Sequence, residues 1–554
     1  MKGAKIVMEC LVEQGVEAVF GYPGGTILNI YDALYDYSDK IKHYLTSHEQ
    51  GASHAADGYA RSSGKVGVCF ATSGPGATNL VTGLATAYMD SVPVVAITCN
   101  VSKSLLGRDT FQEVDIAGIT MPITKHNYIV YDVKNLADTI REAFYIAKSG
   151  RPGPVLIDIP KDITVDECEF TPKPVKEYVP KESMDKAEFD RAVNRLNKCK
   201  APMIIAGGGV IKSNAEKELY EFAKRLNSPI ASTLMGLGSY PESDKNFTGM
   251  VGMHGTKASN LAVSNCDLLI AIGMRFSDRV TSDTSKFAKG SKVLHIDIDP
   301  AEINKNIRAD YELIGDAKLV LQELLAAVEQ KTDDAWLNRI LEMKENKVDM
   351  DSPNAPLNPQ YILESINAKL DDDAIITTEV GQNQMWTAQY YKFNKPRKLI
   401  TSGGLGTMGF GTGASIGCKV ANPDKTVVAI AGDGSFRMNC NELATVEHYD
   451  LPIVYVILNN QTLGMVRQWQ TLFYNKRYSE TTLDRGPNFK MLAEAFHVKG
   501  YEVATKEQFE IAIEEALQSG KPALIDCRIV TDECVLPMVA PGKPIQNVIT
   551  EIGK

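Results

Sequence analysis

The sequence predicts an α/β fold that contains three doubly wound parallel sheets. Short apolar runs rich in Val and Ile, typical of strands that are buried on both faces, alternate with helical segments along the whole chain. Gly, Asp and Asn cluster directly after several of these runs, as expected where strands end in loops. Two polar, proline-containing segments, residues 171–186 and 344–359, separate three such blocks.

We therefore expect three domains, at residues 1–170, 187–335 and 356–554, and a length of 554 residues agrees with that number. In the first domain the expected strands lie near residues 66–71, 93–98 and 154–159. In the second they lie near residues 203–206, 268–272 and 293–298, and in the third near residues 375–378, 427–431, 453–458 and 524–527.

The composition is that of an ordinary globular protein, with 44% hydrophobic and 23% charged residues. A net charge of −10 without a basic run argues against nucleic acid as a partner. The ten Cys are scattered without a CxxC pair, which favours free thiols in a reducing cytosol. The first residues lack the apolar core of a secretory leader, and no apolar stretch approaches the roughly 20 residues that span a bilayer. We expect a cytoplasmic protein without a membrane partner.

The most informative motif in the third block is Gly432-Asp433-Gly434-Ser435, followed by Leu458-Asn459-Asn460. Each cluster ends a predicted buried strand, and residues 438–449 are expected to form the helix between them. Both clusters then emerge at the same edge of the sheet, where open α/β folds bind ligands. A carboxylate and an amide oxygen suit Mg²⁺, and the glycines let backbone approach a diphosphate. Two ordinary strand-to-helix turns remain the alternative.

These paired motifs resemble those of the thiamine diphosphate (ThDP)-dependent enzymes. Over nearly its whole length the chain is similar to one family among them, the acetohydroxyacid synthase (acetolactate synthase) large catalytic subunits. The resemblance implies a pyrimidine-binding, a central FAD-binding and a diphosphate-binding domain, in that order. It also implies that Asp433, Asn460 and the carbonyl of Thr462 bind Mg²⁺, and that Gly432, Gly434 and Ser435 line the ThDP site.

Glu49, in the segment Ser47-His48-Glu49-Gln50, is the candidate catalytic acid. By itself, a Glu at the start of a helix is usually a cap or a surface residue. The resemblance instead implies a Glu that shares a proton with N1′ of the cofactor's aminopyrimidine and so activates the thiazolium. Since Glu49 and the metal ligands lie in different domains, the family pattern implies a site shared between two subunits, and hence a homodimer or a higher homo-oligomer.

Gly404, Gly406 and Gly409 form a GxGxxG pattern, but no acidic residue follows at the distance that a dinucleotide fingerprint requires. The family pattern implies instead a loop beneath ThDP, with Met408 holding the two cofactor rings together. A flexible turn with a core Met is the alternative. Further residues implied at the ThDP site are Gly25, Gln382, Asn383, Gln384 and Met465.

The turns at residues 22–25 and 72–79 offer backbone donors for a polar ligand and match the synthase family. Phe111, Gln112 and Lys161 correspond to residues that border the substrate channel in that family, although Lys161 alone is typical of a solvated surface. Trp469 corresponds to the residue that favours 2-oxobutanoate over pyruvate as second substrate, with Met465 and Val466 beside it. A lone Trp is more often a core residue.

The middle block resembles the FAD-binding segments of the biosynthetic synthases, with Ser277 where Asp is common. Since the net reaction is not a redox reaction, the flavin would have a structural role. Arginines paired with surface acids are the alternative. The implied FAD-binding residues are Arg151, Gly207, Gly208, Gly209, Met253, His254, Gly255, Thr256, Gly273, Arg275, Asp278, Arg279, Val280, Asp297 and Ile298.

The resemblance implies decarboxylation of pyruvate on ThDP and ligation of the hydroxyethyl carbanion to a second 2-oxo acid, in branched-chain amino acid biosynthesis. Pyruvate as acceptor gives 2-acetolactate, and 2-oxobutanoate gives 2-aceto-2-hydroxybutanoate. A separate regulatory small subunit is expected, and residues 534–542 resemble a tail that closes over the site. The rival interpretations are another flavin-containing ThDP enzyme, such as pyruvate oxidase, and a non-catalytic protein on a ThDP fold.

Overall fold

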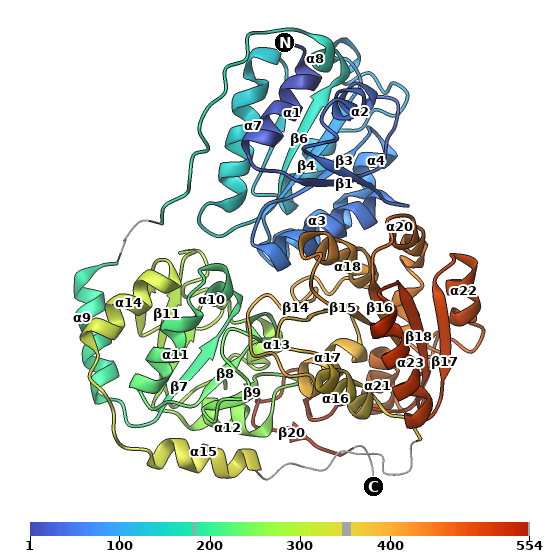
Figure 1. Cartoon of the computed structure of the whole chain (residues 1–554). Coiled ribbons are helices and arrows are strands. Elements are labelled where there is room, and N and C mark those ends of the chain that lie inside the picture. Colours follow the sequence, from blue (N-terminus) through green and yellow to red (C-terminus); the bar gives the residue numbers. More distant parts are fainter. Residues whose placement is uncertain (181–183, 346–355, 552–554) are drawn as a thin grey trace.

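The computed structural model describes residues 1–180, 184–345 and 356–551, and in these residues three six-stranded parallel sheets form three domains (Figure 1). The predicted fold class is thereby confirmed. Of the two predicted connecting segments, residues 181–183 and 346–355 lie outside the described residues. Helices cover the faces of each sheet. In the view of Figure 1 the N-terminal domain lies above the middle domain and the third domain, which are side by side.

The N-terminal sheet has the strand order β2-β1-β3-β4-β6-β5, and the third sheet repeats this pattern as β14-β13-β15-β16-β18-β17. The N-terminal strands are β1 (Ala18–Gly21), β2 (Lys42–Leu45), β3 (Gly67–Ala71), β4 (Val94–Asn100), β5 (His126–Ile129) and β6 (Val155–Pro160). The strands of the third sheet are β13 (Ile375–Thr378), β14 (Leu399–Ile400), β15 (Val427–Gly432), β16 (Ile453–Asn459), β17 (Lys499–Val503) and β18 (Ala523–Arg528). The first and third domains therefore share one topology.

The middle sheet has the order β12-β11-β10-β7-β8-β9, which is that of dinucleotide-binding sheets, with a reversal of strand order between β7 and β10. Its strands are β7 (Pro202–Ala206), β8 (Ile230–Ser232), β9 (Phe247–Met250), β10 (Leu268–Ile272), β11 (Lys292–Asp297) and β12 (Tyr311–Ile314). A short antiparallel pair near the C-terminus, β19 (Met538–Val539) and β20 (Val548–Ile549), lies outside the three sheets.

The helices of the N-terminal domain are α1 (Gly3–Glu13), α2 (Leu28–Tyr35), α3 (Glu49–Ser63), α4 (Pro75–Asn79), α5 (Val81–Met89), α6 (Ile116–Thr120), α7 (Val133–Lys148) and α8 (Lys161–Val165). Those of the middle domain are α9 (Lys186–Lys198), α10 (Gly208–Lys212), α11 (Glu216–Arg225), α12 (Lys257–Asn265), α13 (Asp278–Thr281), α14 (Ala317–Ala327) and α15 (Ala335–Glu345). Those of the third domain are α16 (Pro359–Lys369), α17 (Gln382–Tyr390), α18 (Phe410–Ala421), α19 (Asp433–Phe436), α20 (Leu443–His448), α21 (Gly464–Phe473), α22 (Phe489–Ala495) and α23 (Lys506–Ser519).

Local sequence explains why these elements form where they do. The strands β4, β6, β10 and β16 are buried along their whole length and are mainly apolar, and Asp158 of β6 is hydrogen-bonded by Thr98 and Asn100 of β4. Several helices begin at a side chain that caps them. Asn358 accepts a hydrogen bond from the Tyr361 N–H at 2.8 Å, with Pro359 at the first helical position, and Asp132 caps α7 in the same way.

One sequence expectation is corrected. Residues 438–449 were expected to form a single helix, whereas the crossover consists of α19, a 3₁₀ turn at Cys440–Glu442 and α20. Asn439 lies outside the helical region (φ −135°, ψ 27°), and its side chain donates a 2.7 Å hydrogen bond to the carbonyl of Gly409. The non-helical backbone at Asn439 therefore interrupts the helix, and the contact with Gly409 holds its side chain in place.

Helices α3 and α18 pack against each other and join the N-terminal domain to the third domain (Figure 1). The backbones approach so closely that a Cβ on Gly417 would lie 1.8 Å from the carbonyl oxygen of Ala55. A Cβ on Gly58 would lie 2.2 Å from the carbonyl oxygen of Ala414. The interdomain contact therefore requires glycine at both positions.

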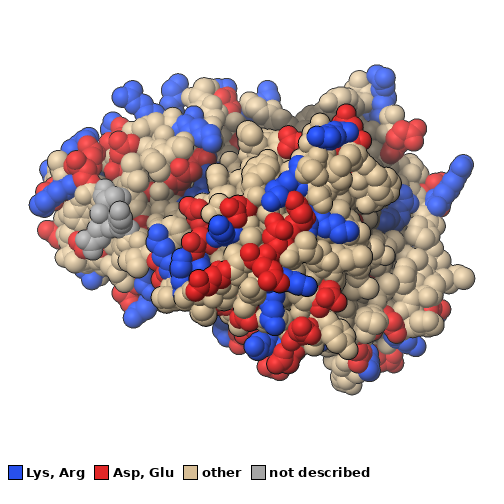
Figure 2. Space-filling view, turned by 90° about the horizontal axis from the view of Figure 1, so that it is seen from above, with Lys and Arg blue, Asp and Glu red and all other residues tan. Residues whose placement is uncertain are grey.

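Basic and acidic side chains are interspersed over the face seen in Figure 2, with uncharged areas between them. Among the residues that the structure describes, no helix has both the length and the apolar character needed to cross a bilayer.

We predict that Gly417→Ala lowers the thermal unfolding midpoint, although Ala favours a helix over Gly by about 1 kcal/mol. Forcing a methyl group against the Ala55 carbonyl costs more than this, since overpacking typically costs about 1–3 kcal/mol. Gly290→Ala is the matched control, because no atom lies within 4 Å of its Cβ position. Equal midpoints for the two variants would contradict the close helix contact.

Candidate functional site

The carboxyl edge of the third sheet brings the two sequence motifs together. Strands β15 and β16 are paired in parallel, with Gly432 opposite Leu458. Asp433 therefore leaves the end of one strand, and Asn460 follows the end of its neighbour. The predicted βαβ arrangement, with both clusters at one edge of the sheet, is confirmed for these residues.

Asp433 is a buried carboxyl group, with 4% of its surface exposed. Burial, together with the nearby carboxyl group of Asp526, raises the pKa of Asp433 to about 7. Within the described chain, no Lys, Arg or His forms an ion pair with it (the described ion pairs involve other residues). A buried carboxylate without a counter-ion is unfavourable, so this residue fits a bound divalent cation.

The surroundings of Asn460 leave its amide oxygen available to a metal ion. Its Nδ2 donates a 3.0 Å hydrogen bond to Oε1 of Gln382, which orients the oxygen away from Gln382. Within residues 1–180, 184–345 and 356–551, that oxygen accepts one hydrogen bond, a long one of 3.3 Å from the N–H of Thr462. Nearby, Oδ1 of Asn383 is buried and has no hydrogen-bond partner in the described residues. The residues present thus fit a metal ion and a polar ligand at this edge.

Glycines allow helix α17 and the strand ends to approach closely at this edge. A Cβ on Gly464 would lie 1.8 Å from Oε1 of Gln382, and one on Gly432 would lie 3.3 Å from Nδ2 of Asn383. A side chain at position 464 would collide with Gln382, and one at position 432 would press on Asn383. These glycines thus serve the close packing of helix α17 on the two strand ends.

The predicted glycine-rich loop lies at the same edge. Gly406 and Gly409 have positive φ angles of 71° and 89°, which favour glycine. Met408, between them, is half-buried. The side chain of Gln384 donates hydrogen bonds to Oγ1 of Thr401 (2.6 Å) and to the carbonyl of Ser402 (3.0 Å). Helix α17 and the loop are therefore fixed relative to one another.

The C-terminal segment folds back onto this edge. Gln382 donates a 2.8 Å hydrogen bond to the carbonyl of Glu533. Gln468 bonds the backbone of Val535 in both directions, accepting from its N–H (2.8 Å) and donating to its carbonyl (2.9 Å). Further on, the Val539 N–H donates to the carbonyl of Met253 in the middle domain. The tail bridges two domains beside the candidate site.

Glu49 occupies the first turn of α3 and is buried. Its Oε2 accepts a 2.9 Å hydrogen bond from Nδ2 of Asn79, and a Cβ on Gly76 would lie 3.2 Å from its Oε1. These contacts come from the turn at residues 72–79, which the sequence also singled out. Within one chain, the hydrogen bonds described for Glu49 remain in the N-terminal domain and do not reach the metal edge of the third domain.

The other candidates from the first domain lie near that turn or at the surface. A Cβ on Gly74 would lie 2.8 Å from the carbonyl oxygen of Gln112, so this residue packs on the turn. Phe111 beside it is 87% exposed, and Lys161, at the start of α8, is also exposed. Gly25 has open space around its Cβ position. The chain thus has two groups of candidates, one per terminal domain.

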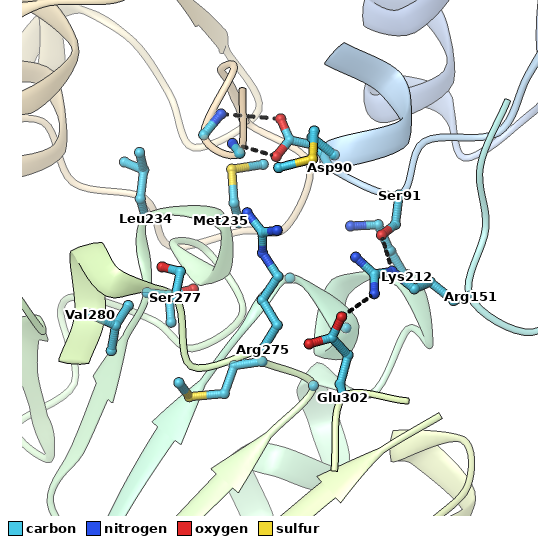
Figure 3. A pocket seen from close by; sticks show the side chains of 18 of the residues that line it. Asp90, Ser91, Arg151, Lys212, Leu234, Met235, Arg275, Ser277, Val280 and Glu302 are labelled. Carbon is cyan, nitrogen blue, oxygen red and sulfur yellow. Dashed lines mark hydrogen bonds and ion pairs between the residues drawn. The ribbon is translucent and has the colours of Figure 1, made fainter. Parts of the chain in front are cut away.

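A cavity of about 1400 Å³ opens at the reversal of strand order in the middle sheet and extends to the first and third domains (Figure 3). Val380, Gly406, Met465 and Trp469 line its far side. Most residues that the sequence assigned to a flavin line it as well, namely Arg151, Gly208, Gly209, Met253, His254, Gly273, Arg275, Asp278, Arg279, Val280, Asp297 and Ile298.

The remaining three assigned residues have local structural functions. Gly207 packs so closely on the neighbouring turn that its Cβ would lie 2.2 Å from the carbonyl oxygen of Gly273. A Cβ on Gly255 would lie 2.6 Å from the backbone nitrogen of Gly252. Thr256 caps helix α12 by accepting a 3.1 Å hydrogen bond from the N–H of Ser259. These three residues do not line the cavity themselves, but they support the backbone of the residues that do.

Some of the cationic side chains that line the cavity form ion pairs with acidic residues of the described chain, and others do not (Figure 3). Arg151 is engaged by Glu302 (2.7 Å), Asp299 (3.1 Å) and Ser91 (2.8 Å). Arg275 extends into the cavity, and its guanidinium forms no ion pair or hydrogen bond with the described part of the chain. Lys212 also lines the cavity, and burial lowers its pKa to about 8. The cavity therefore suits an anionic ligand.

Met465 and Trp469 lie on one face of helix α21, with Val466 exposed beside them. Both line the large cavity and a neighbouring cavity of about 560 Å³. The Trp469 ring stacks edge-on against Phe473 at 5.8 Å, and its Nε1 is buried without a hydrogen-bond partner in the described chain. The indole therefore forms part of a wall between two cavities.

Sequence reasoning missed several residues that the structure places at these sites, notably Asp90, Lys212 and Gln468. Lys212 follows the Gly207–Gly209 turn by three residues, and this proximity was the signal available for it. Asp90 and Gln468 act through contacts with residues distant in the sequence, which no local pattern marks.

Comparisons with known proteins agree with this division into three domains. The chain matches three thiamine pyrophosphate enzyme families: the N-terminal TPP binding domain over residues 1–119, the central domain over residues 189–324 and the C-terminal TPP binding domain over residues 379–527. Thiamine pyrophosphate is another name for ThDP.

Similar curated proteins cover the whole chain. A probable acetolactate synthase large subunit of Methanocaldococcus jannaschii is 50% identical over 100% of this chain and 96% of its own length. Acetolactate synthase large subunits of Cyanidium caldarium and Haemophilus influenzae are 46% and 44% identical. These alignments cover 98% and 99% of this chain, and 95% and 98% of the respective relatives.

Proposed function

The chain belongs to the thiamine pyrophosphate enzymes and, within them, to the acetolactate synthase large subunits, and from this premise we propose that it forms acetolactate from pyruvate. In this reaction one pyruvate loses CO₂, and the remaining two-carbon unit is transferred to a second 2-oxo acid. Pyruvate as acceptor gives 2-acetolactate, and 2-oxobutanoate gives 2-aceto-2-hydroxybutanoate, in branched-chain amino acid biosynthesis. The observation that carries the proposal is the match over the full length of proteins with this name.

Asp433, Asn460 and the carbonyl of Thr462 are the residues that would hold Mg²⁺. The buried carboxyl group of Asp433, without an ionic partner in the described chain, supports this assignment, because a cation would offset the cost of its burial. Gly432 beside it has no side chain, so the backbone there can approach the diphosphate of ThDP. When bound, ThDP supplies the carbon nucleophile and the electron sink for decarboxylation.

Glu49 would exchange a proton with the aminopyrimidine, and Asn79 orients its carboxyl group. Since the contacts of Glu49 remain in the N-terminal domain, we infer that a second copy of the chain brings a Glu49 to the metal edge of the first. Large exposed apolar side chains on the N-terminal domain support such an interface, namely Leu28, Tyr35, Phe111, Met121 and Tyr131. The name of the relatives, large subunit, also suggests a separate small regulatory subunit.

FAD is the ligand that best fits the cavity at the middle sheet. The cavity lies where parallel sheets of this strand order bind dinucleotides. It presents to a diphosphate the amine of Lys212 and the guanidinium of Arg275, which is unpaired among the described residues. Its size of about 1400 Å³ exceeds the usual 300–1,000 Å³ of small-molecule pockets. It therefore has room for a dinucleotide.

All ten cysteines are free, which supports a reducing compartment such as the cytoplasm for this enzyme.

The activity is tested by incubating the protein with pyruvate, Mg²⁺ and ThDP without oxygen. We expect one acetolactate and one CO₂ from each two pyruvates, and we expect no reaction when either cofactor is omitted. Asp433→Asn should abolish the reaction, because a neutral amide binds Mg²⁺ weakly. Asp450→Asn is the matched control, since this Asp lies just before the opposite end of β16 and pairs with Lys521 at the surface. Activity that persists in Asp433→Asn, or that requires oxygen, would contradict the proposal.

Trp469→Leu should retain acetolactate formation and lose the preference for 2-oxobutanoate. The indole forms a wall of the cavity, and the extra methylene of that acceptor offers only about 1–3 kcal/mol of discrimination. The measurement is the product ratio when pyruvate and 2-oxobutanoate compete. An unchanged ratio would show that another residue contacts the second substrate.

Arg275→Ala should weaken FAD binding by roughly 10-fold, because it removes a charge-assisted contact with the diphosphate. Riboflavin, which lacks phosphate, should bind equally to both proteins. Quenching of flavin fluorescence measures both affinities, and Lys292→Ala, an exposed residue of the same domain, serves as control. An equal loss for FAD and riboflavin would place Arg275 away from the diphosphate, and no flavin binding to the unaltered protein would reject FAD.

A further inference from the structure

The loop from Ser402 to Gly409 carries the two residues assigned to the ThDP site, Gly406 and Met408. Its tip faces the large cavity, where Gly403, Gly404, Leu405 and Gly406 contribute to the lining. Leu405 is 44% exposed, so little packs on the tip itself. The hydrogen bonds that fix the loop lie on either side of this tip.

Asp90 holds the first end (Figure 3). Its Oδ1 accepts the N–H of Gly404 at 2.7 Å, and its Oδ2 accepts the N–H of Gly403 at 3.1 Å. Asp90 follows helix α5 of the N-terminal domain and is only 5% exposed. A Cβ on Gly404 would lie 2.7 Å from its Oδ1, so the close approach requires glycine there. A carboxylate that receives two backbone N–H groups forms a strong, directional contact.

The carboxylate of Asp90 is oriented by a second group. Arg61 on helix α3 forms a 3.0 Å ion pair with Oδ2 of Asp90 and also pairs with Asp57. The same guanidinium donates a 2.8 Å hydrogen bond to the carbonyl of Thr401, just before the loop. Asp57 shares Arg61 with Asp90, yet its described hydrogen bonds are to Arg61 and not to the loop. Both aspartates pair with Arg61, and among the described contacts only Asp90 bonds the loop.

Glu379 of the third domain holds the other end. Its buried carboxylate accepts the N–H groups of Gly409 (2.7 Å) and Gly411 (2.8 Å), at the start of helix α18. Between the ends, the hydroxyl groups of Thr86 and Thr407 lie 2.7 Å apart and join the loop once more to the N-terminal domain. Two carboxylates from two domains therefore anchor one short loop.

We propose that Asp90 is a positioning residue for ThDP, which holds the loop of Gly406 and Met408 in the shape that accepts the cofactor. This inference rests on the proposed function. Without the contacts of Asp90 the loop adopts additional conformations. ThDP then binds only the fraction of molecules whose loop has the binding conformation, so the apparent affinity for ThDP is lower. Once the site is saturated, the competent shape is restored.

The test compares Asp90→Asn with Asp57→Asn. An amide at position 90 places an NH₂ group where an oxygen accepted a backbone N–H, whereas the same change at position 57 removes no direct hydrogen bond to the loop and alters only the pairing of Arg61. We expect Asp90→Asn to raise the apparent dissociation constant of ThDP about 10-fold, with the turnover number at saturating ThDP nearly unchanged. Asp57→Asn should leave that constant within a few-fold. Quenching of tryptophan fluorescence gives the affinity, and thermal unfolding shows that each variant is folded.

Thr407→Val provides a second variant that leaves every charge in place. It removes the hydroxyl contact with Thr86 and should weaken ThDP binding in the same sense, by a smaller factor. A double-mutant cycle of Asp90→Asn with Glu379→Gln should be non-additive in ThDP affinity, because both act on one loop.

Equal effects of Asp90→Asn and Asp57→Asn on ThDP affinity would overturn the inference, since the cause would then be the Arg61 ion pairs. An unaltered affinity in a folded Asp90→Asn protein, or a turnover number that falls at saturation with affinity unchanged, would do so as well. Failure of the unaltered protein to bind ThDP or to form acetolactate would instead reject the proposed function, so the two failures are distinguishable.

Discussion

The close approach of helices α3 and α18 is the constraint on which the rest of the structure depends. Small residues bring the two backbones into contact, and this joins the N-terminal domain to the third domain. Once that contact exists, Arg61 of α3 reaches the carbonyl of Thr401, and Asp90 reaches the N–H groups of Gly403 and Gly404. Glycines with no chemistry of their own thus decide where the loop beside both candidate cofactor sites lies.

The parallel sheets contribute the second constraint. Neighbouring parallel strands end at the same edge of a sheet. Asp433 and Asn460 therefore lie near each other because β15 and β16 are paired, and no further contact is needed to bring them together. Burying the carboxyl group of Asp433 raises its pKa to about 7. In the protein without a bound cation, this burial lowers the stability of the folded state. Such a cost is typical of a functional site, where a bound cation offsets it. The middle sheet follows the same rule, since its cavity opens at the reversal of strand order.

The strands and the motifs at their ends were predictable because each is encoded by a short stretch of sequence. Apolar β-branched runs predicted β15 and β16, and the Gly-Asp-Gly and Asn-Asn clusters marked their ends. The single helix expected over residues 438–449 was wrong, because Asn439 has a non-helical backbone and only α20 forms a helix in this range, after a 3₁₀ turn. Asp90 and Gln468 escaped prediction for another reason. Their hydrogen bonds reach residues far away in the chain, and local patterns carry no information about such contacts.

The sequence by itself determined the three α/β domains, the residue types at the metal edge and the family to which the chain belongs. Three features were decided by the tertiary structure alone. The first and third sheets share one strand order. Among the described residues Arg151 pairs with two acids while Arg275 pairs with none, and the hydrogen bonds of Glu49 stay within the N-terminal domain of a single chain. The physical reason is the distance along the sequence over which each interaction acts. Strand propensity and turn chemistry act over a few residues, whereas ion pairing and domain contact depend on which distant side chains the packed helices bring together.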